Sequence, residues 1–180
     1  MTDNKRGGLP PIAPIDPKDI VHYYVDGGIK NGVAASAFVR KAFRQKPPEE
    51  VRRVFSTKVS SAKSEMRAIR LAVEDALSEG IDPSRVVIHT DQKSLGFNNF
   101  KRVSPMSLLR EEIVNQGFNL SYIPSTHILE DIDVSKVPKK VLNALTVHNL
   151  VKSTLASGNN RHRYHLMKKR AKRRSKKRKH

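Results

Sequence analysis

The stretch from residue 51 to residue 90 constrains the fold of this chain more than any other part of it. Residues 51–59 have the composition of a strand, and the apolar run 86–90 has that of a second. Between them, apolar residues recur at three- and four-residue spacing, the stripe of an amphipathic helix: Ala68, Ile69, Ala72, Val73, Ala76 and Leu77. We expect Ser61 or Ser64 to cap this helix and Gly80 to end it. A strand, a helix and a strand at this spacing form a βαβ unit with parallel strands and a right-handed crossover, so the chain is predicted to be α/β.

The rest of the chain supplies further strands and helices around this unit. Apolar runs predict strands at 21–25, 34–39 and 120–123, and Asn31-Gly32 provides turn chemistry between the first two. Helices are predicted shortly after Asp91, over 107–116, and over 139–155. The predicted fold is a five-stranded mixed sheet flanked by helices, whose first strands are antiparallel hairpins.

Charge and proline divide the chain into three parts. Prolines at 10, 11, 14 and 17 predict an extended arm over residues 1–20, followed by one domain over 21–157. Residues 158–180 are predicted to be a disordered tail, because its last twenty residues hold twelve Lys or Arg and no acid. The tail also resembles a nuclear localisation signal and the tails of ribosomal proteins.

The composition narrows the class of partner. The chain has 35 Lys and Arg against 17 Asp and Glu, a net charge of +18, which predicts a polyanion and favours nucleic acid over an acidic membrane surface. Cysteine is absent, which excludes disulfides and thiolate metal sites, and no apolar stretch has membrane-spanning length. We expect an intracellular monomer that is cytoplasmic and nucleoid-associated, or nuclear in a eukaryotic host.

Three carboxylates stand at the predicted boundaries of these elements. Asp26 closes the run 21–25, Glu65 opens the long helix, and Asp91 closes the run 86–90. Side chains at strand ends and at a helix start can converge in an α/β sheet, and converging carboxylates are the oxygen ligands that Mg²⁺ prefers. Taken singly, each acid also fits a purely structural role: Asp26 as a turn residue, Glu65 as a first-turn helix acid and Asp91 as an N-cap.

Four segments, in order, resemble the motifs of type 1 ribonucleases H. They are Tyr24-Val25-Asp26-Gly27-Gly28, Ser61-Ala62-Lys63-Ser64-Glu65-Met66, Ile88-His89-Thr90-Asp91 and Ile123-Pro124-Ser125-Thr126-His127. The resemblance covers about residues 21–155.

The resemblance implies a ribonuclease H-like fold and hydrolysis of the RNA strand of RNA/DNA hybrids. Asp26, Glu65 and Asp91 would hold two ions, Mg²⁺ or Mn²⁺, with Asp26 bridging them. One ion would activate the attacking water and the other would stabilise the leaving 3′ oxygen. His127 would be an accessory catalytic residue.

Substrate contacts are expected from the motifs and from the tail. Gly27, Ser61 and Lys63 lie within the motifs that resemble the family. The tail, by composition, is expected to bind phosphates non-specifically through Lys168, Lys169, Arg170, Arg173 and Arg174.

Two departures from the family pattern bear on metal and substrate. Val147-His148-Asn149-Leu150-Val151 puts His148 where the family has a fourth acid, which predicts a His148 ligand and a bias toward Mn²⁺. Asp131 or Asp133 is the alternative ligand. Ser61-Ala62 replaces an asparagine pair that reads the hybrid, and Ala62 has no side-chain donor. Two alternatives therefore stay open: a nuclease for structured or junction substrates, and a nucleic-acid-binding or ribosome-associated protein with a decayed nuclease site.

Overall fold

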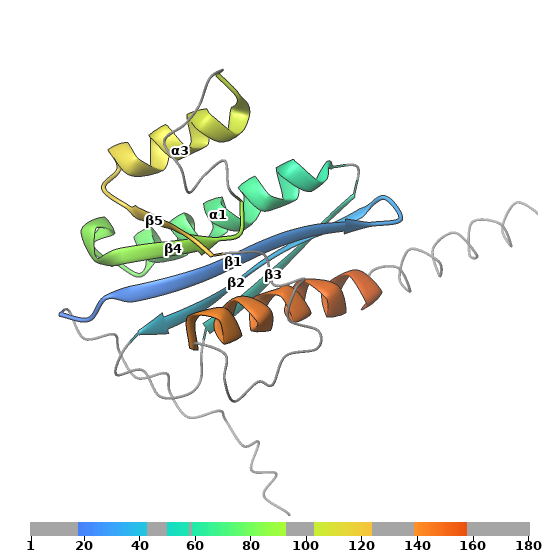
Figure 1. The fold of residues 1–180 in the computed structure, drawn as a ribbon, viewed down its shortest axis with the longest axis horizontal. Coiled ribbons are helices and arrows are strands. Elements are labelled where there is room, and N and C mark those ends of the chain that lie inside the picture. Colours follow the sequence, from blue (N-terminus) through green and yellow to red (C-terminus); the bar gives the residue numbers. More distant parts are fainter. Residues whose placement is uncertain (1–17, 43–49, 58, 93–102, 124–138, 158–180) are drawn as a thin grey trace, which may run out of the picture.

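A five-stranded mixed sheet forms the centre of the molecule, as predicted (Figure 1). The computed structural model describes residues 18–42, 50–57, 59–92, 103–123 and 139–157. The strand order is β3-β2-β1-β4-β5. The sheet is built from β1 (Val21–Lys30), β2 (Val33–Ala42), β3 (Glu50–Thr57), β4 (Val86–Thr90) and β5 (Asn119–Tyr122). Strands β1, β2 and β3 pair antiparallel in succession, whereas β4 pairs parallel with both β1 and β5.

The first strand is longer than the sequence predicted. It was expected to end at Asp26, but it continues through Gly27 and Gly28, which pair with Ser36 and Ala35 of β2. The turn is instead made by Asn31 and Gly32, whose φ values of 53° and 75° are those of a two-residue type I′ hairpin. The two glycines stay in the ladder because a helix packs closely against each of them, on opposite faces of the sheet.

The βαβ unit is present, but its strands are not neighbours. Between β3 and β4 the chain crosses β2 and β1, so that β4 pairs with β1 at the centre of the sheet. This crossing brings the end of β4 beside the middle of β1, which lies far earlier in the sequence.

Helix boundaries follow local capping chemistry. Helix α1 (Ser61–Ser78) is capped by Ser60, whose hydroxyl accepts from the Lys63 N–H, and not by Ser61 or Ser64 as predicted. Gly80, at φ 67°, follows the end of α1. A short 3-10 helix, η1 (Pro83–Arg85), precedes β4, and a capping box at Ser104 begins α3 (Pro105–Asn115). A further helix spans residues 139–157 and is called the 139–157 helix below.

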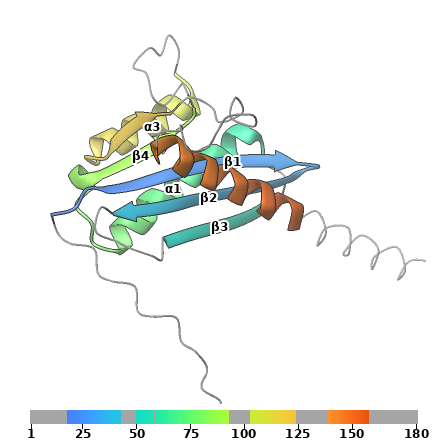
Figure 2. The ribbon, with the colours of Figure 1, turned by 60° about the horizontal axis from the view of Figure 1, so that its bottom comes forward.

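Helices cover both faces of the sheet (Figures 1 and 2). Helices α1 and α3 pack on one face, over a core that includes Tyr23, Ile69 and Ile88. The 139–157 helix packs on the other face, over a second core that includes Tyr24 and Val147. Because side chains alternate along a strand, Asp26 lies on the same face as Tyr24, under the 139–157 helix.

Several predictions fall on residues that the structure does not describe. These are the arm over 1–17, the helix expected after Asp91, the loop that holds His127, Asp131 and Asp133, and the tail over 158–180. Among the described residues, no helix is long and apolar enough to cross a membrane.

Candidate metal centre

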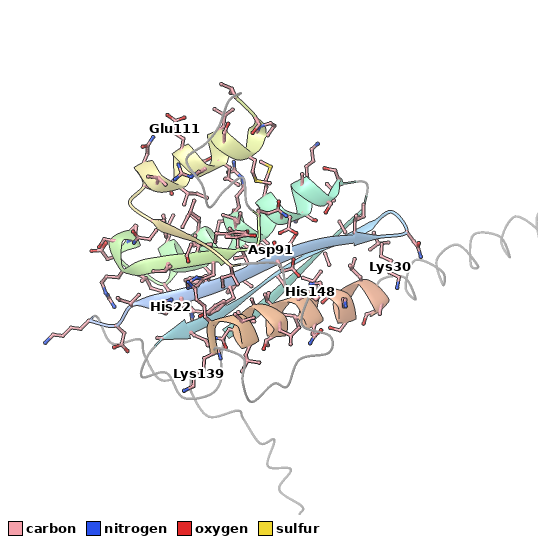
Figure 3. All side chains as sticks on the ribbon, in the orientation of Figure 1. His22, Lys30, Asp91, Glu111, Lys139 and His148 are labelled. Carbon is pink, nitrogen blue, oxygen red and sulfur yellow. The ribbon has the colours of Figure 1, made fainter. Side chains whose placement is uncertain are left out.

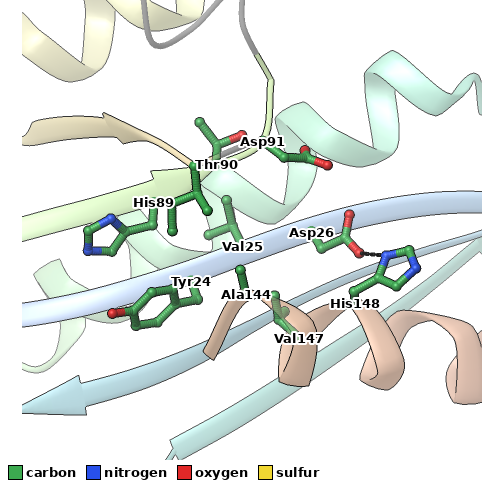
Figure 4. A pocket seen from close by; sticks show the side chains of 10 residues that line it. Tyr24, Val25, Asp26, His89, Thr90, Asp91, Ala144, Val147 and His148 are labelled. Carbon is green, nitrogen blue, oxygen red and sulfur yellow. Dashed lines mark hydrogen bonds and ion pairs between the residues drawn. The ribbon is translucent and has the colours of Figure 1, made fainter. Parts of the chain in front are cut away.

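Asp26 and Asp91 are brought together by the pairing of β1 with β4. Tyr24 is the register partner of His89 in this parallel pair, so the aspartates two residues further on reach the same level of the sheet. Figure 4 shows both carboxylates at this point, with His148 of the 139–157 helix beside Asp26. The central position of β4 therefore decides the geometry of this pair.

Glu65 reaches the same place from α1 because the helix approaches β1 very closely at Gly27. A Cβ at Gly27 would lie 2.4 Å from the carbonyl carbon of Ser64 and 2.5 Å from the nitrogen of Glu65. The Gly27 N–H instead donates to Glu65 Oε2 at 3.1 Å. The Ser36 hydroxyl donates to the Ser64 carbonyl at 2.7 Å. Strands β1 and β2 thus seat the first turns of α1 and aim Glu65 at the two aspartates.

The three carboxylates form one cluster. Each offers an oxygen, and these oxygens lie within 4.8 Å of one another. Asp26 and Glu65 are only 8% and 4% exposed, and Asp91 is half-buried. Burial, then the negative charges of Asp26 and Asp91, raise the pKa of Glu65 to about 10.

This arrangement fits a hard divalent cation. Three buried or half-buried carboxylates repel one another unless a proton or a metal ion compensates their charge. Their oxygens are the ligand type of Mg²⁺ and Mn²⁺. The residues present can therefore hold metal, while its identity and number belong to the proposal below.

His148 contacts this cluster through Asp26. Its Nδ1 lies 3.0 Å from Asp26 Oδ2, the contact drawn in Figure 4. Figure 3 shows the same approach within the whole molecule, with the 139–157 helix carrying His148 toward the sheet. The His148 ring therefore contacts an oxygen of a candidate metal ligand. His148 lies where the sequence predicted a metal ligand, but in the structure it contacts the side chain of Asp26.

The carboxylates lie at one end of an open groove of about 360 Å³. Of the predicted substrate residues, Gly27 and Ser61 line this groove, whereas Lys63 is exposed and is not among its lining residues. The three carboxylates and His148, also predicted as site residues, line it as well. The remaining lining residues were not predicted as site residues: Gly28, Ile29, Gln92, Val151, Lys152 and Leu155. Val151, Lys152 and Leu155 could have been predicted from helical spacing. They lie three, four and seven residues after His148, and residues at these spacings share one face of a helix.

Two histidines that the sequence did not single out lie farther along the same face. His22 Nδ1 lies 2.8 Å from His89 Nε2, and Tyr24 stacks on His89 with ring centroids 4.6 Å apart. Burial, then the charge of Lys140, lower the pKa of His22, and burial followed by Lys140 and His22 lowers that of His89 to about 3. The His89 ring is buried, at 4% exposure, whereas His22 is partly exposed.

Comparison with known proteins bears on the fold. No family model matches the chain, and no curated protein matches it. The prototype foamy virus protease-reverse transcriptase superposes with a TM-score of 0.51 at 16% identity, over 81% of this chain and 22% of that one. The fold is ribonuclease H-like. At this identity the likeness shows the fold alone, and the chain spans less than a quarter of the viral enzyme's length.

Two further solved structures are similar at lower scores. An RNase H1 from the halophilic archaeon Halobacterium salinarum has a TM-score of 0.48 at 18% identity, over 59% of this chain and 86% of that one. The N-terminal RNase H domain of a Mycobacterium tuberculosis protein has a TM-score of 0.47 at 16% identity, over 59% and 88%.

Proposed function

We propose that this protein is a metal-dependent endonuclease that hydrolyses the RNA strand of RNA/DNA hybrids. The observation that carries the proposal is the convergence of Asp26, Glu65 and Asp91 to within 4.8 Å at the end of a groove. These acids come from two strands and a helix that are far apart in the sequence. Carboxylates gathered in this way need a proton or a cation to compensate their charge, and their oxygens are the ligands that a hard divalent cation prefers.

Two divalent ions, Mg²⁺ or Mn²⁺, are proposed as the cofactor. When bound, they supply an activated water and stabilise the charge of the leaving 3′ oxygen. Asp26, Glu65 and Asp91 would hold them. The proposed ligands are pre-positioned, because the Gly27 N–H holds Glu65 and His148 holds Asp26 before any ion arrives.

The proposed substrate contacts extend from the metal centre. Gly27 and Ser61 line the groove beside the carboxylates and are proposed to contact the strand that is cut. His127 and the basic residues of the tail lie outside the described residues, and their roles as accessory catalytic residue and phosphate binders remain part of the proposal. The choice of hybrid over other nucleic acids rests on the motifs that resemble type 1 ribonucleases H.

One observation favours a second function, that of a nucleic-acid-binding protein without nuclease activity. His148 takes up Asp26 Oδ2 at 3.0 Å, and a hydrogen-bonded carboxylate oxygen is less available to a metal ion. In that case the basic charge would bind nucleic acid while the carboxylates stayed without metal.

Metal titration separates the two functions. Calorimetry with Mg²⁺ and Mn²⁺ is expected to show binding by the wild type, a loss of at least about tenfold in affinity for Glu65→Gln, and no change for Glu74→Gln. Glu74 is the matched control because it is an exposed glutamate on the same helix. Absence of metal binding in the wild type would favour the binding protein. Unchanged affinity in His148→Ala would refute the sequence prediction that His148 is a metal ligand.

Cleavage assays then define the substrate. The wild type is expected to cut a labelled RNA/DNA hybrid more rapidly than single-stranded RNA, duplex RNA or a four-way DNA junction. Preferential cutting of the junction would replace the hybrid as the substrate while leaving the metal centre in place.

A further inference from the structure

Near the start of β1, away from the metal centre, basic side chains gather from three elements. Lys41 comes from β2 and His22 from β1, while Lys139 and Lys140 are the first two residues of the 139–157 helix. Both lysines of the helix are exposed, and Lys41 and His22 are half-buried. Figure 3 shows His22 and Lys139 toward this end of the molecule. These four residues are called the basic surface below.

The pairing of the strands places the members of the basic surface close together. Lys41 is the register partner of His22, so both side chains lie on the face of the sheet that the 139–157 helix covers. Lys41 Nζ donates to Asn143 Oδ1 of that helix at 2.6 Å. Lys140 Nζ donates to Ser121 Oγ of β5 at 2.9 Å. The basic surface therefore reaches from β2 to β5, three strand spacings or about 14 Å.

The charges of the basic surface are poorly compensated within the protein. The 139–157 helix has three lysines and no acid, and two of those lysines begin it. A helix dipole favours anions at its start and cations at its end, so Lys139 and Lys140 stand at the unfavourable end. Among the described residues no carboxylate pairs with either lysine. Burial, then the charge of Lys140, lower the pKa of His22. An anion from outside the protein would relieve this repulsion.

The spacing of the basic surface from the metal centre suits a nucleic-acid backbone. His22 precedes Asp26 by four residues on β1 and lies on the same face, which places it about 13 Å away. One strand of a duplex has a phosphate about every 3.4 Å along the helix axis, so this distance corresponds to about four nucleotides. A single small anion would meet only part of a surface about 14 Å wide, whereas a backbone presents a row of phosphates.

We propose that the basic surface binds backbone phosphates of a nucleic acid about four nucleotides from the bond that is cut, as a second contact separate from the metal centre. Resting on the proposed function for its partner, this contact would hold the substrate away from the reacting atoms. Phosphate contacts carry no sequence information, so the basic surface would position the duplex and would not select its sequence.

Two cations elsewhere in the molecule provide a matched control. Arg67 is exposed on α1, which covers the opposite face of the sheet, and Lys30 ends β1 far from His22 (Figure 3). Replacing Lys41 and Lys140 by glutamine, or Arg67 and Lys30 by glutamine, removes two positive charges in either case. Lys140→Gln alone is a further variant that is safe for folding, because Lys140 is exposed.

The test measures binding of a fluorescein-labelled RNA/DNA hybrid of about 12 base pairs, long enough to span both contacts, by anisotropy without divalent ions from about 50 to 300 mM salt. The Lys41→Gln, Lys140→Gln double variant is expected to bind about tenfold more weakly at low salt. Its slope of log K against log salt should fall by about 2, and that of Lys140→Gln by about 1, since each lysine contact to a phosphate contributes about 1. The control pair should keep the slope of the wild type.

Two results would overturn the inference. One is a slope that is unchanged in the double variant, or that falls equally in the control pair, because the effect would then be absent or due to net charge alone. The other is tighter binding of a polyglutamate peptide than of the hybrid through the same two lysines, because the partner would then be an acidic peptide.

Kinetics separate the basic surface from the proposed nuclease. The double variant is expected to raise KM for the hybrid by about tenfold while kcat stays within about twofold, since neither lysine touches the reacting atoms. Binding that depends on Lys41 and Lys140 without cleavage of any substrate would keep the basic surface and refute the nuclease. Cleavage by a double variant whose salt slope is that of the wild type would keep the nuclease and refute the basic surface.

Discussion

Gly27 couples the fold to the candidate metal centre through its missing side chain. Its backbone both pairs with Ser36 of β2 and donates to Glu65 Oε2. The backbone of Ser64 and Glu65 occupies the space that a Cβ would need. The packing of α1 against β1 and the position of the proposed ligand Glu65 therefore both depend on the absence of a side chain at Gly27.

Gly27→Ala is expected to displace the start of α1 and to weaken metal binding. Overpacking of this kind costs typically about 1–3 kcal/mol of unfolding free energy, and the displaced Glu65 should lower Mn²⁺ affinity by about tenfold or more. Urea denaturation and calorimetry measure the two effects. Gly28→Ala is the control, because its Cβ would meet only the side chains of Val151 and Leu155, at 3.0 and 3.2 Å. Equal metal affinities in the two variants would contradict the proposed seat of α1.

The raised pKa of Glu65 predicts how stability and metal binding depend on pH. Its pKa rises from 4.5 to about 10, so ionisation costs folded-state stability, and the metal-free protein should lose stability as pH rises from about 4.5 toward 10. A bound cation removes this cost and displaces the proton, so the increase in Tm on adding Mn²⁺ should grow with pH. Thermal melting from pH 5.5 to 8.5 checks this, and Glu65→Gln should flatten the dependence. A metal-induced shift independent of pH in the wild type would refute it.

At the scale of the elements, α1 is also held at its far end by a buried polar group. Asp75 Oδ2 accepts from Arg40 and from the hydroxyl of Tyr23, each at 2.9 Å. The side chains of Arg40 and Asp75 are 4% and 2% exposed. Burial, followed by the charge and the hydrogen bond of Asp75, raises the pKa of Tyr23 above its ordinary value. The phenol therefore stays protonated and acts as a donor.

Asp75→Asn is expected to destabilise the protein strongly. It removes the nearer of two carboxylates that pair with the buried Arg40, at 2.9 Å against 3.8 Å for Glu79. Loss of one partner of a buried pair costs about 3–5 kcal/mol. The control is Glu112→Gln, which breaks the ion pair between Arg70 and Glu112, whose side chains are 50% and 45% exposed. Such a surface pair is worth at most about 1 kcal/mol. Urea denaturation of both variants measures the difference, and similar losses would refute a special role for the buried group.

Most helices and strands could be predicted from local sequence patterns, but the order in which the strands pair could not. The strand Val86–Thr90 was predicted with its observed boundaries, and the stripe of α1 gave its buried face. The end of β1 was wrong because Asp26-Gly27-Gly28 is typical of a turn, whereas packing from both faces keeps these glycines in the sheet. The predicted cap of α1, Ser61 or Ser64, was wrong because the nearby Ser60 has the same capping chemistry and takes that position.

The three acids of the candidate site could be predicted from the sequence. Asp26, Glu65 and Asp91 were found because each follows or opens an element, and the structure brings them together. The groove was missed, because Ile29, Lys152 and Leu155 meet only through the packing of β1 against the 139–157 helix. His148 was singled out by motif position, and its contact with Asp26 is a property of the packed helix.

At the scale of the whole molecule, positive charge is concentrated in one part of the sequence, residues 161–180. The chain carries a net charge of +18, and residues 161–180 hold twelve of its 35 Lys and Arg. Such a segment, tethered to a catalytic domain, raises the local concentration of nucleic acid without altering the chemistry.

Removal of residues 158–180 is expected to raise KM for a hybrid by about tenfold or more while kcat stays within about twofold. The salt dependence of binding should also weaken, since each lost phosphate contact lowers the slope of log K against log salt by about 0.9. Cleavage kinetics give KM and kcat. Binding measured by anisotropy from about 50 to 300 mM salt gives the slope of log K against log salt. A fall in kcat with an unchanged slope would show that the segment acts in catalysis.

The measurement that tests the account most directly is cleavage of a labelled RNA/DNA hybrid in Mg²⁺ and in Mn²⁺ by the wild type, Asp26→Asn and Asp82→Asn. Asp82 is a matched aspartate that caps η1, outside the metal cluster. We expect metal-dependent cleavage by the wild type and Asp82→Asn, and a loss of about a hundredfold or more in Asp26→Asn. Cleavage that survives in Asp26→Asn, or a hybrid that the wild type binds but never cuts in either metal, would contradict it.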